Sequence, residues 1–312
     1  MTALRLVFAG TPDFACPSLE ALVAAGHEIA LVVTQPDRPR GRGMHLAPPA
    51  VKMAAERLGL EVAQPAEIDT LEFRRKMEEL APDATIVVAF GQKIPSWMLT
   101  MTRLGCLNVH ASLLPFYRGA APIQRALLNG ERETGVTIMR LDEGWDTGPI
   151  LAQETVGIGP DENAGSLHGR LADAGARLLV SALGGLAAGT LEPRPQDDSL
   201  ATKAPKVRPE EMRISLLLPA AKLHNLIRAL SPAPLAETFY AGSRLQIVKA
   251  RLADTAADAA PGTVLAAGRE GILVQTGQGG LLIEEIKPAN GRIMPAAAYA
   301  RGHRLAPGER LA

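Results

Sequence analysis

The sequence has 312 residues, of which 47% are hydrophobic and 21% charged, and its 33 Lys and Arg balance 33 Asp and Glu. This composition excludes a disordered or fibrous chain, and the length predicts two domains. We expect a cytoplasmic protein without a metal centre. The reasons are that no apolar run is long enough to span a membrane, no secretory leader is expected, and the two cysteines form neither a disulfide framework nor a zinc-ligand cluster.

Strands and helices alternate through the first part of the chain. The pattern predicts strands over residues 4–10, 28–34 and 85–89 and helices over 14–25, 51–58 and 71–80. This order indicates a mostly parallel sheet with right-handed crossovers. The turn after the first strand has Gly10 but then Pro12 and Ala15, so it lacks the further glycines of a dinucleotide-binding fingerprint.

Residues 35–50 form an unusual connection in which Arg38, Arg40 and Arg42 alternate with Pro and Gly. This composition predicts a long loop with neither helix nor strand. A long loop in a compact domain is often functional, and the planar guanidinium of Arg suits phosphates. The alternative interpretation is an exposed, protease-sensitive surface loop.

Asn108 and His110 carry the most informative polar pattern. On an extended strand their spacing points both side chains to one face, and Leu114-Pro115 soon afterwards must leave the sheet. Asp146 follows in a loop between Gly144 and Gly148 and could reach the imidazole. Asn can donate to a developing oxyanion, His can move a proton, and Asp can orient the His. The alternative is that all three serve local turns.

No residue of the chain is an obvious nucleophile beside this trio. Ser112 lacks the Gly-x-Ser-x-Gly elbow, and Cys106 has no adjacent basic residue to make it a thiolate. The pattern therefore favours acyl transfer in which the substrate supplies the nucleophile. Phe90-Gly91 follows the buried strand before the trio, and ligands gather beyond the carboxyl ends of parallel strands. We expect Phe90 and Gly91 to form one wall of the pocket.

The rest of the chain predicts a second, smaller module. A helix over 122–128, strands over 135–141 and 150–156 and a helix or helix pair over 163–186 complete the first domain, 1–190. Four prolines mark a linker over 191–209, and the second domain, 210–312, combines a helix over 220–230 with short strands between Gly turns, typical of a small β-barrel. Residues 1–200 contain 18 Lys and Arg against 24 Asp and Glu, whereas 201–312 contain 15 against 9. A basic module suits a phosphate backbone.

Several segments together resemble the folate-dependent formyltransferases, in particular the members that act on methionyl-tRNA. They are residues 7–15, 108–115, 117–123 and 135–139, the last running into Asp146-Thr147-Gly148. The resemblance spans the chain and is densest before residue 150. It implies a Rossmann-like α/β domain followed by a small open β-barrel of the oligonucleotide-binding type. Trp145, Pro149 and Ala233 depart from the residues usual in the family.

The resemblance also assigns roles to residues. Asn108, His110 and Asp146 would be catalytic, and Ser112, Leu113, Leu114 and Pro115 would border the reduced folate beside Phe90 and Gly91. The loop with Arg38, Arg40 and above all Arg42 would enter the acceptor arm of tRNA, and the second domain would help to hold it.

The function so implied is transfer of a formyl group from 10-formyltetrahydrofolate to the free α-amine of methionyl-initiator tRNA for translation initiation. The amine attacks directly and forms a tetrahedral intermediate, without a metal, and we expect a monomer. Two alternatives stay open. One is another formyl-folate transferase that acts on an amino sugar or a ribonucleotide, and the other is a non-catalytic module that binds tRNA or folate.

Overall fold

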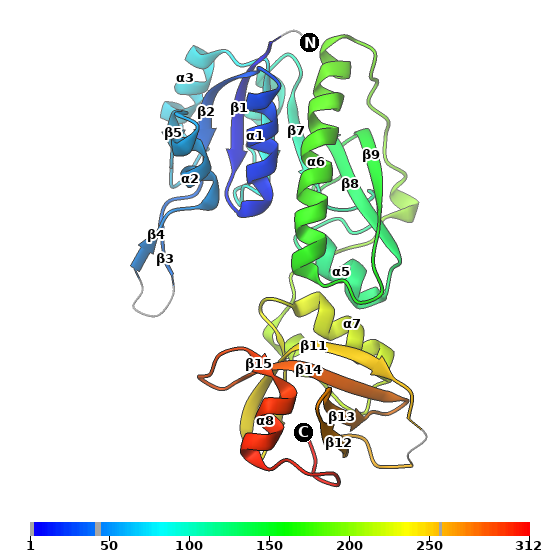
Figure 1. Ribbon diagram of the computed structural model, residues 1–312. Helices are drawn as coiled ribbons and strands as arrows, with labels where there is room; N and C mark the ends of the chain where they lie inside the picture. The colour runs from blue at the N-terminus through cyan, green and yellow to red at the C-terminus, as the bar shows by residue number, and fades with distance from the viewer. Residues whose placement is uncertain (1–2, 41–44, 256–257) are drawn as a thin grey trace. The chain divides into compact units, whose positions relative to one another are not determined.

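The computed structural model describes residues 3–40, 45–255 and 258–312, and the chain forms two compact units (Figure 1). The first unit contains the described parts of residues 1–119, 133–157 and 168–203, and the second those of 120–132, 158–167 and 204–312. The chain therefore passes back and forth between the two units, and each unit contains three separate stretches of sequence. The simple boundaries expected from sequence, 1–190 and 210–312, stay a prediction.

A seven-stranded sheet forms the centre of the first unit. Its strand order is β5 (Val62–Ala63), β2 (Glu28–Val33), β1 (Arg5–Gly10), β6 (Ala84–Val88), β7 (Cys106–His110), β8 (Glu133–Arg140) and β9 (Ile150–Gly157). The pairs from β5 to β7 are parallel, and β8 and β9 add two antiparallel strands. The strand order reverses between β1 and β6, which is where ligands usually bind in such sheets.

Helices pack against the strands and bury their apolar sides. Those of the first unit are α1 (Cys16–Ala24), α2 (Ala50–Arg57), α3 (Leu71–Leu80), α4 (Ser96–Met101) and most of α6 (Ala164–Ala187), with short 3-10 turns at Asp13–Ala15 and Asp198–Leu200. Thr70 caps α3 by accepting from Phe73 N at 3.2 Å, and Phe73 and Met77 point into a core with Val7 and Leu31. The helix α6 lies close to β7, because a Cβ on Gly175 would be 2.7 Å from Val109 Cγ1.

An antiparallel sheet dominates the second unit. Its strands follow the order β10 (Ala236–Tyr240), β11 (Ser243–Ala253), β14 (Gly280–Pro288), β13 (Gly271–Gln275) and β12 (Val264–Gly268), with β15 (Met294–Pro295) beside β14. The helices are α5 (Pro122–Asn129), α7 (Ala220–Leu230) and α8 (Ala296–His303), with a 3-10 turn at Pro209–Met212. The expected Rossmann-like, mostly parallel sheet is confirmed, and the second domain, expected as a small open β-barrel of the oligonucleotide-binding type, is an antiparallel β domain. No helix within the described ranges is long and apolar enough to cross a membrane.

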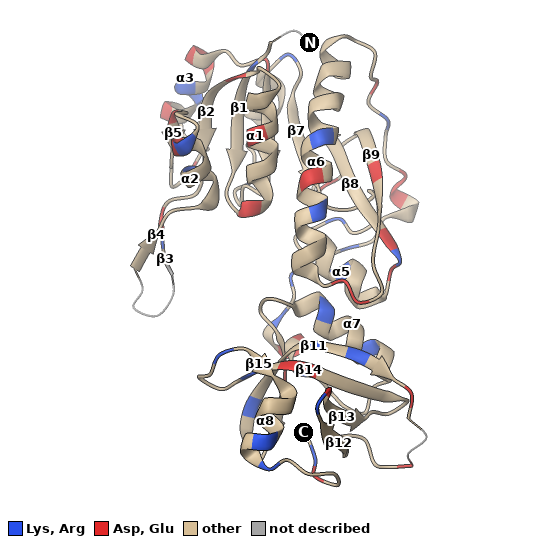
Figure 2. Ribbon diagram, in the orientation of Figure 1, with Lys and Arg blue, Asp and Glu red and all other residues tan. Residues whose placement is uncertain are grey.

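Charged side chains in the second unit are not evenly placed (Figure 2). Residues 287–304, which run from the end of β14 through α8, contain four cations and no Asp or Glu: Lys287, Arg292, Arg301 and Arg304. By contrast, Lys249 and Arg251 on β11 pair with Glu284 at 3.0 and 3.2 Å. The second unit therefore has cations that carboxylates neutralise and a separate group that lies in an acid-free segment.

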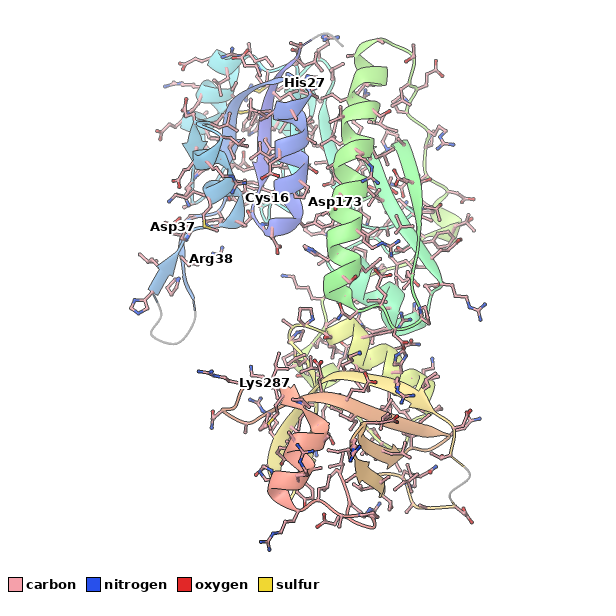
Figure 3. All side chains as sticks on the ribbon, viewed as in Figure 1. Cys16, His27, Asp37, Arg38, Asp173 and Lys287 are labelled. Carbon is pink, nitrogen blue, oxygen red and sulfur yellow. The ribbon has the colours of Figure 1, made fainter. Side chains whose placement is uncertain are left out.

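The described parts of the connection over residues 35–50 contain strands that the sequence did not predict. Within it β3 (Arg38–Arg40) and β4 (His45–Ala47) pair as an antiparallel ribbon, so the prediction that no strand forms there is wrong. A two-stranded ribbon has only edges, and an edge strand tolerates the missing N–H of Pro39. Asp37 anchors the base of the ribbon, because it accepts from Lys52 Nζ at 3.0 Å and from Gln64 Nε2 at 2.7 Å (Figure 3). Arg42 lies outside the described residues.

Candidate active site

The strand β7 presents two polar side chains on one face near its carboxyl end. Asn108 pairs with Val87 on β6 and Met139 on β8, and His110 pairs with Thr137 on β8, so the strand register fixes the position of both residues. They are 9% and 6% exposed. The Asn108 amide makes no hydrogen bond with any described residue, although buried amides normally find partners. A hydrogen-bond donor is therefore left available at this point.

The structure brings His110 and Asp146 together, as the sequence predicted. His110 Nε2 lies 3.0 Å from the carbonyl oxygen of Tyr117, and His110 Nδ1 lies 3.8 Å from Asp146 Oδ1. A carbonyl only accepts, so the hydrogen bond to Tyr117 assigns a proton to Nε2. Nδ1 then faces the Asp146 carboxylate, which helps to fix the orientation of the ring.

Asp146 is held in a left-handed backbone conformation with φ 58°. Its Oδ2 accepts from Gly119 N at 2.8 Å, and its backbone oxygen accepts from Gln196 Nε2 at 2.9 Å. Gln196 Nε2 also donates to the Gly148 oxygen at 2.7 Å, while Arg118 donates to Gln196 Oε1. Gly119 therefore fixes the carboxylate of Asp146, and Gln196 fixes the backbone of its loop.

Sequence reasoning missed Gln196, because it lies 50 residues after Asp146 in the stretch expected to be a linker. That stretch is bound to the first unit: Ile150 and Arg194 exchange two backbone hydrogen bonds of 2.8 Å, and Thr202 O accepts from Arg118 N. The only local signal was a Gln directly after a proline. The identity of its partners depends on long-range pairing that no local pattern records.

Neither Cys106 nor Ser112 is available as a nucleophile beside the trio. Cys106 is fully buried, its thiol donates to Met98 O at 3.2 Å, and burial raises its pKa to about 12. Ser112 is also fully buried, and its hydroxyl donates to Phe116 O at 2.6 Å. A thiol that stays protonated and a hydroxyl that is already bonded to a carbonyl are poor nucleophiles. The site therefore suits a reaction in which the attacking group comes from a substrate.

The predicted folate-bordering residues surround the strand ends. The Phe90 ring is 2% exposed and packs in the core, while Phe90 O accepts from Thr11 Oγ1 at 2.7 Å and so links the exits of β1 and β6. Gly91 follows with φ 89°. In the turn from Ser112 through Leu113 and Leu114 to Pro115, Thr137 Oγ1 accepts from Leu114 N and donates to Ser112 O. Both segments are well fixed, and a ligand would meet mainly their backbone.

Two family models cover most of the sequence. The model described as formyl transferase matches residues 4–183, and the model described as formyl transferase, C-terminal domain, matches 206–304. The chain belongs to the formyl transferase family. The expected resemblance is thus confirmed.

Individual relatives support the same assignment. A methionyl-tRNA formyltransferase of Moorella thermoacetica is 51% identical over 308 residues, which is 99% of each chain. A solved methionyl-tRNA formyltransferase from Clostridium thermocellum shares the fold, with a TM-score of 0.55 and 18% identity over 80% of this chain and 94% of that chain. HypX from Aquifex aeolicus, solved with tetrahydrofolic acid, has a TM-score of 0.68 and 19% identity over 96% of this chain and 47% of that chain.

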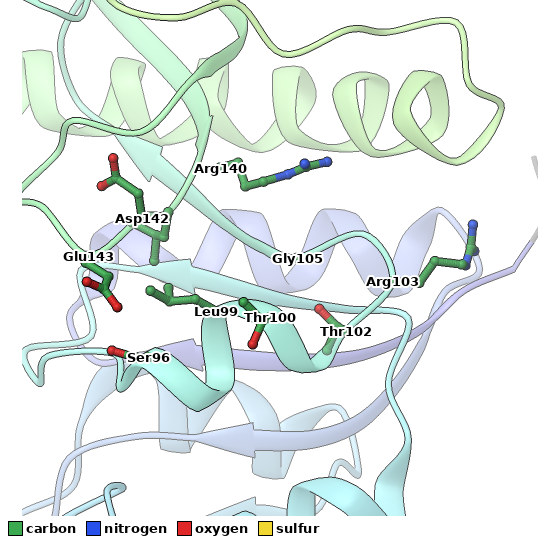
Figure 4. A pocket seen from close by; sticks show the side chains of 10 residues that line it. Ser96, Leu99, Thr100, Thr102, Arg103, Gly105, Arg140, Asp142 and Glu143 are labelled. Atoms are coloured by element: carbon green, nitrogen blue, oxygen red, sulfur yellow. The ribbon is translucent and has the colours of Figure 1, made fainter.

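A pocket that the sequence did not indicate lies beside α4. Its volume is about 480 Å³, and its wall includes α4 and residues 140–143, which begin the loop that carries Asp146 (Figure 4). Leu99 and Leu141 give the wall apolar surface. Thr102 Oγ1 and Arg140 Nε are buried there without a partner among the described residues. The pocket thus combines apolar area with polar atoms that a ligand could satisfy.

Two of the three arginines predicted to bind tRNA lie within the described residues. Arg38 and Arg40 belong to β3, and the exposed Arg38 donates to Gln35 Oε1 at 3.0 Å (Figure 3). Arg42 lies outside the described residues. Within the described part of the chain, no group of three or more His, Cys, Asp or Glu could hold a metal ion.

Proposed function

We propose that the chain transfers the formyl group of 10-formyltetrahydrofolate to the free α-amine of methionyl-initiator tRNA. One observation carries this proposal: an unpartnered Asn108 amide and the His110–Asp146 pair meet at the end of β7, where neither Cys106 nor Ser112 is available as a nucleophile. The relative from Moorella thermoacetica, at 51% identity over the full length, supports methionyl-tRNA as the acceptor over an amino sugar or a ribonucleotide.

The reaction needs one bond to form and one to break at the formyl carbon. The amine nitrogen attacks that carbon and gives a tetrahedral intermediate with a negatively charged oxygen. The Asn108 amide donates to this oxygen, and the His110 ring, held by the Tyr117 carbonyl and by Asp146, lies beside it. The bond to N10 of the folate then breaks. Asp146 takes the proton that the amine loses and passes it to the departing nitrogen.

The formyl donor is proposed to lie beside the strand ends, along Phe90-Gly91 and the turn from Ser112 to Pro115. We extend this site to the pocket beside α4, whose apolar surface suits the flat ring of a reduced folate. The unpartnered Thr102 Oγ1 and Arg140 Nε could bond with the polar edge of that ring. Filling this pocket should raise KM for the donor and leave KM for the acceptor unchanged.

The acceptor is proposed to bind to two basic surfaces. The first is the β3–β4 ribbon with Arg38, Arg40 and Arg42, which would meet the acceptor arm. The second is the acid-free segment 287–304 of the second unit, whose cations suit a phosphate backbone. We propose that the protein acts as a cytoplasmic monomer.

A formyl transfer assay with alternative acceptors tests this function directly. The protein would be supplied with 10-formyltetrahydrofolate and either methionyl-initiator tRNA, an amino-sugar nucleotide or a ribonucleotide amine. We expect rapid transfer to the charged tRNA alone. Preferred transfer to a small amine would move the chain to another branch of the family. Tight folate binding without transfer to any of the three would mean a non-catalytic binding module.

A further inference from the structure

Three large hydrophobic side chains are exposed around the His110–Asp146 pair. Trp145 is 69% exposed, Leu200 51% and Phe116 43%, and Trp145 directly precedes Asp146. Most large apolar side chains of the first unit are buried, so this grouping is unusual. Exposed aromatic rings beside a reactive centre commonly mark a contact with a substrate.

The three residues belong to segments that hydrogen-bond with one another. Gly119 N donates to Asp146 Oδ2 at 2.8 Å, which joins the segment of Phe116 to that of Trp145. Tyr117 N donates to Thr202 Oγ1 at 2.8 Å, which joins the segment of Phe116 to that of Leu200. Because these bonds link all three segments, we treat the exposed side chains of Trp145, Phe116 and Leu200 as one surface next to the candidate active site, here called the aromatic rim.

Hydrogen bonds hold the loop at residues before and after Trp145. Asp142 Oδ1 accepts from Gly144 N at 3.1 Å and from Thr147 Oγ1 at 2.8 Å, while Gln196 Nε2 donates to the Asp146 and Gly148 oxygens. The indole itself makes no hydrogen bond or ring contact with any described residue. A rigid loop therefore presents a free planar ring. When a flat ligand stacks on this ring, the loop loses little conformational entropy.

A cation lies in the same part of the unit. Lys203 forms a parallel bridge with Arg118, is exposed, and has no ion pair with the described residues. Arg118 itself is held by Gln196 and Asp198. An exposed aromatic ring with an unpaired cation nearby is the combination by which proteins bind single-stranded nucleotides.

We propose that the aromatic rim stacks the terminal nucleobase of the acceptor strand, with Trp145 as the main platform and Lys203 near the adjoining phosphate. The inference rests on the proposed function, in which the amine that attacks belongs to an amino acid esterified to the terminal ribose. The terminal base is then only a few bonds from the reacting amine. Trp145 is correspondingly close, since its Cα is about 3.8 Å from that of Asp146.

Fluorescence offers a binding test that does not depend on turnover. The chain has two tryptophans, and the Trp97 indole donates to Asp69 Oδ1 at 2.9 Å, so Trp97→Phe leaves Trp145 as the single reporter. Titration of this variant with the trinucleotide CCA should quench the emission saturably. Titration with methionine or with 5-formyltetrahydrofolate should leave it unchanged. Quenching by either of these alone would overturn the assignment to a nucleobase, as would no quenching by CCA.

Steady-state kinetics of two Trp145 variants test whether the aromatic ring itself binds the tRNA. Trp145→Leu should raise KM for methionyl-tRNA roughly tenfold, the scale of removing one base–aromatic stack, with KM for the formyl donor unchanged. Trp145→Phe, which keeps an aromatic face, should recover most of that affinity. A rise in KM for the donor instead would place the ring against the folate and overturn the proposal, as would unchanged constants. Lack of formyl transfer by the unmodified protein would refute the proposed function, whereas the fluorescence titration would still judge the stacking.

Discussion

The Asn108 amide is the most exacting test at the scale of a single residue. Asn108→Ala should lower kcat by about a hundredfold or more, because it removes a donor to the oxyanion of the tetrahedral intermediate. The free energy of unfolding should change little, since this amide has no hydrogen bond to a described residue. Steady-state kinetics and thermal unfolding measure the two effects. Near-normal turnover in the folded variant would show that Asn108 is not catalytic.

Asp146→Asn separates charge from position. The amide oxygen can still accept from Gly119 N, so the loop should keep its shape, while the carboxylate charge beside His110 and the proton carrier are removed. We expect kcat to fall by about a hundredfold or more with little change in either KM. Asp198→Asn is the control, because Asp198 is a nearby carboxylate on the exposed side of Arg118. Equal losses of activity in both variants would indicate a general effect of charge.

The trio proposed to be catalytic could be singled out from sequence because its members have local signals, while their roles came from the family resemblance. Asn108 and His110 have strand spacing, and Asp146 lies between glycines. Their positioning partners could not be predicted. The Tyr117 carbonyl and the Gly119 N–H are backbone groups that any residue would supply, and Gln196 acts across 50 residues. Only the folded sheet decides which backbone groups face the imidazole and the carboxylate.

At the scale of elements, Gly148 allows the Asp146 loop to pass close to β8. A Cβ at Gly148 would lie 1.9 Å from the Arg140 backbone oxygen, and that backbone is fixed by Arg140 N donating to Pro149 O. Gly148→Ala should therefore displace the loop, abolish most activity and cost on the order of 2 kcal/mol of unfolding free energy. Gly157→Ala is a matched control at the end of β9, where an added Cβ meets nothing within 4 Å. Similar activities of the two variants would contradict this account.

A charged clamp fixes the 3-10 turn at Pro209–Met212 against α5. Arg125 donates to both carboxylate oxygens of Glu211, and this hydrogen bonding lowers the Glu211 pKa to about 2. The ordinary pKa is 4.5, so the ionised form stabilises the fold above about pH 4.5, and this contribution is lost as pH falls toward 2. Glu211→Gln should lower the unfolding free energy by about 2 kcal/mol at pH 7. The difference from the unmodified protein should shrink between pH 4.5 and 2, whereas a constant difference would exclude the clamp.

Elements with strong end signals were predicted with their observed bounds, and others were not. The helix α3 begins after the Thr70 cap, and α7 begins after Pro219, so the expected ranges 71–80 and 220–230 agree with the structure. The β3–β4 ribbon was missed because Pro and Gly suggested a loop, although a ribbon of edge strands accepts both. The helix α8, rich in Ala and short, lacked a polar–apolar alternation that would announce it.

For the whole molecule, the net charge is zero although the acid-free segment 287–304 is basic. We expect tRNA binding to depend on the cations of this segment. Replacing Lys287 and Arg292 together by Ala should weaken methionyl-tRNA binding and reduce the slope of log K against log salt by about 2, one for each phosphate that the variant no longer neutralises. The control replaces Lys249 and Arg251, which removes the same charge but from cations paired with Glu284 and Glu270. Its slope should change much less.

Folate affinity should respond weakly to salt in all three proteins, the unmodified protein and the two double variants. Equal slopes in both double variants would mean that net charge, and not the acid-free segment, governs binding.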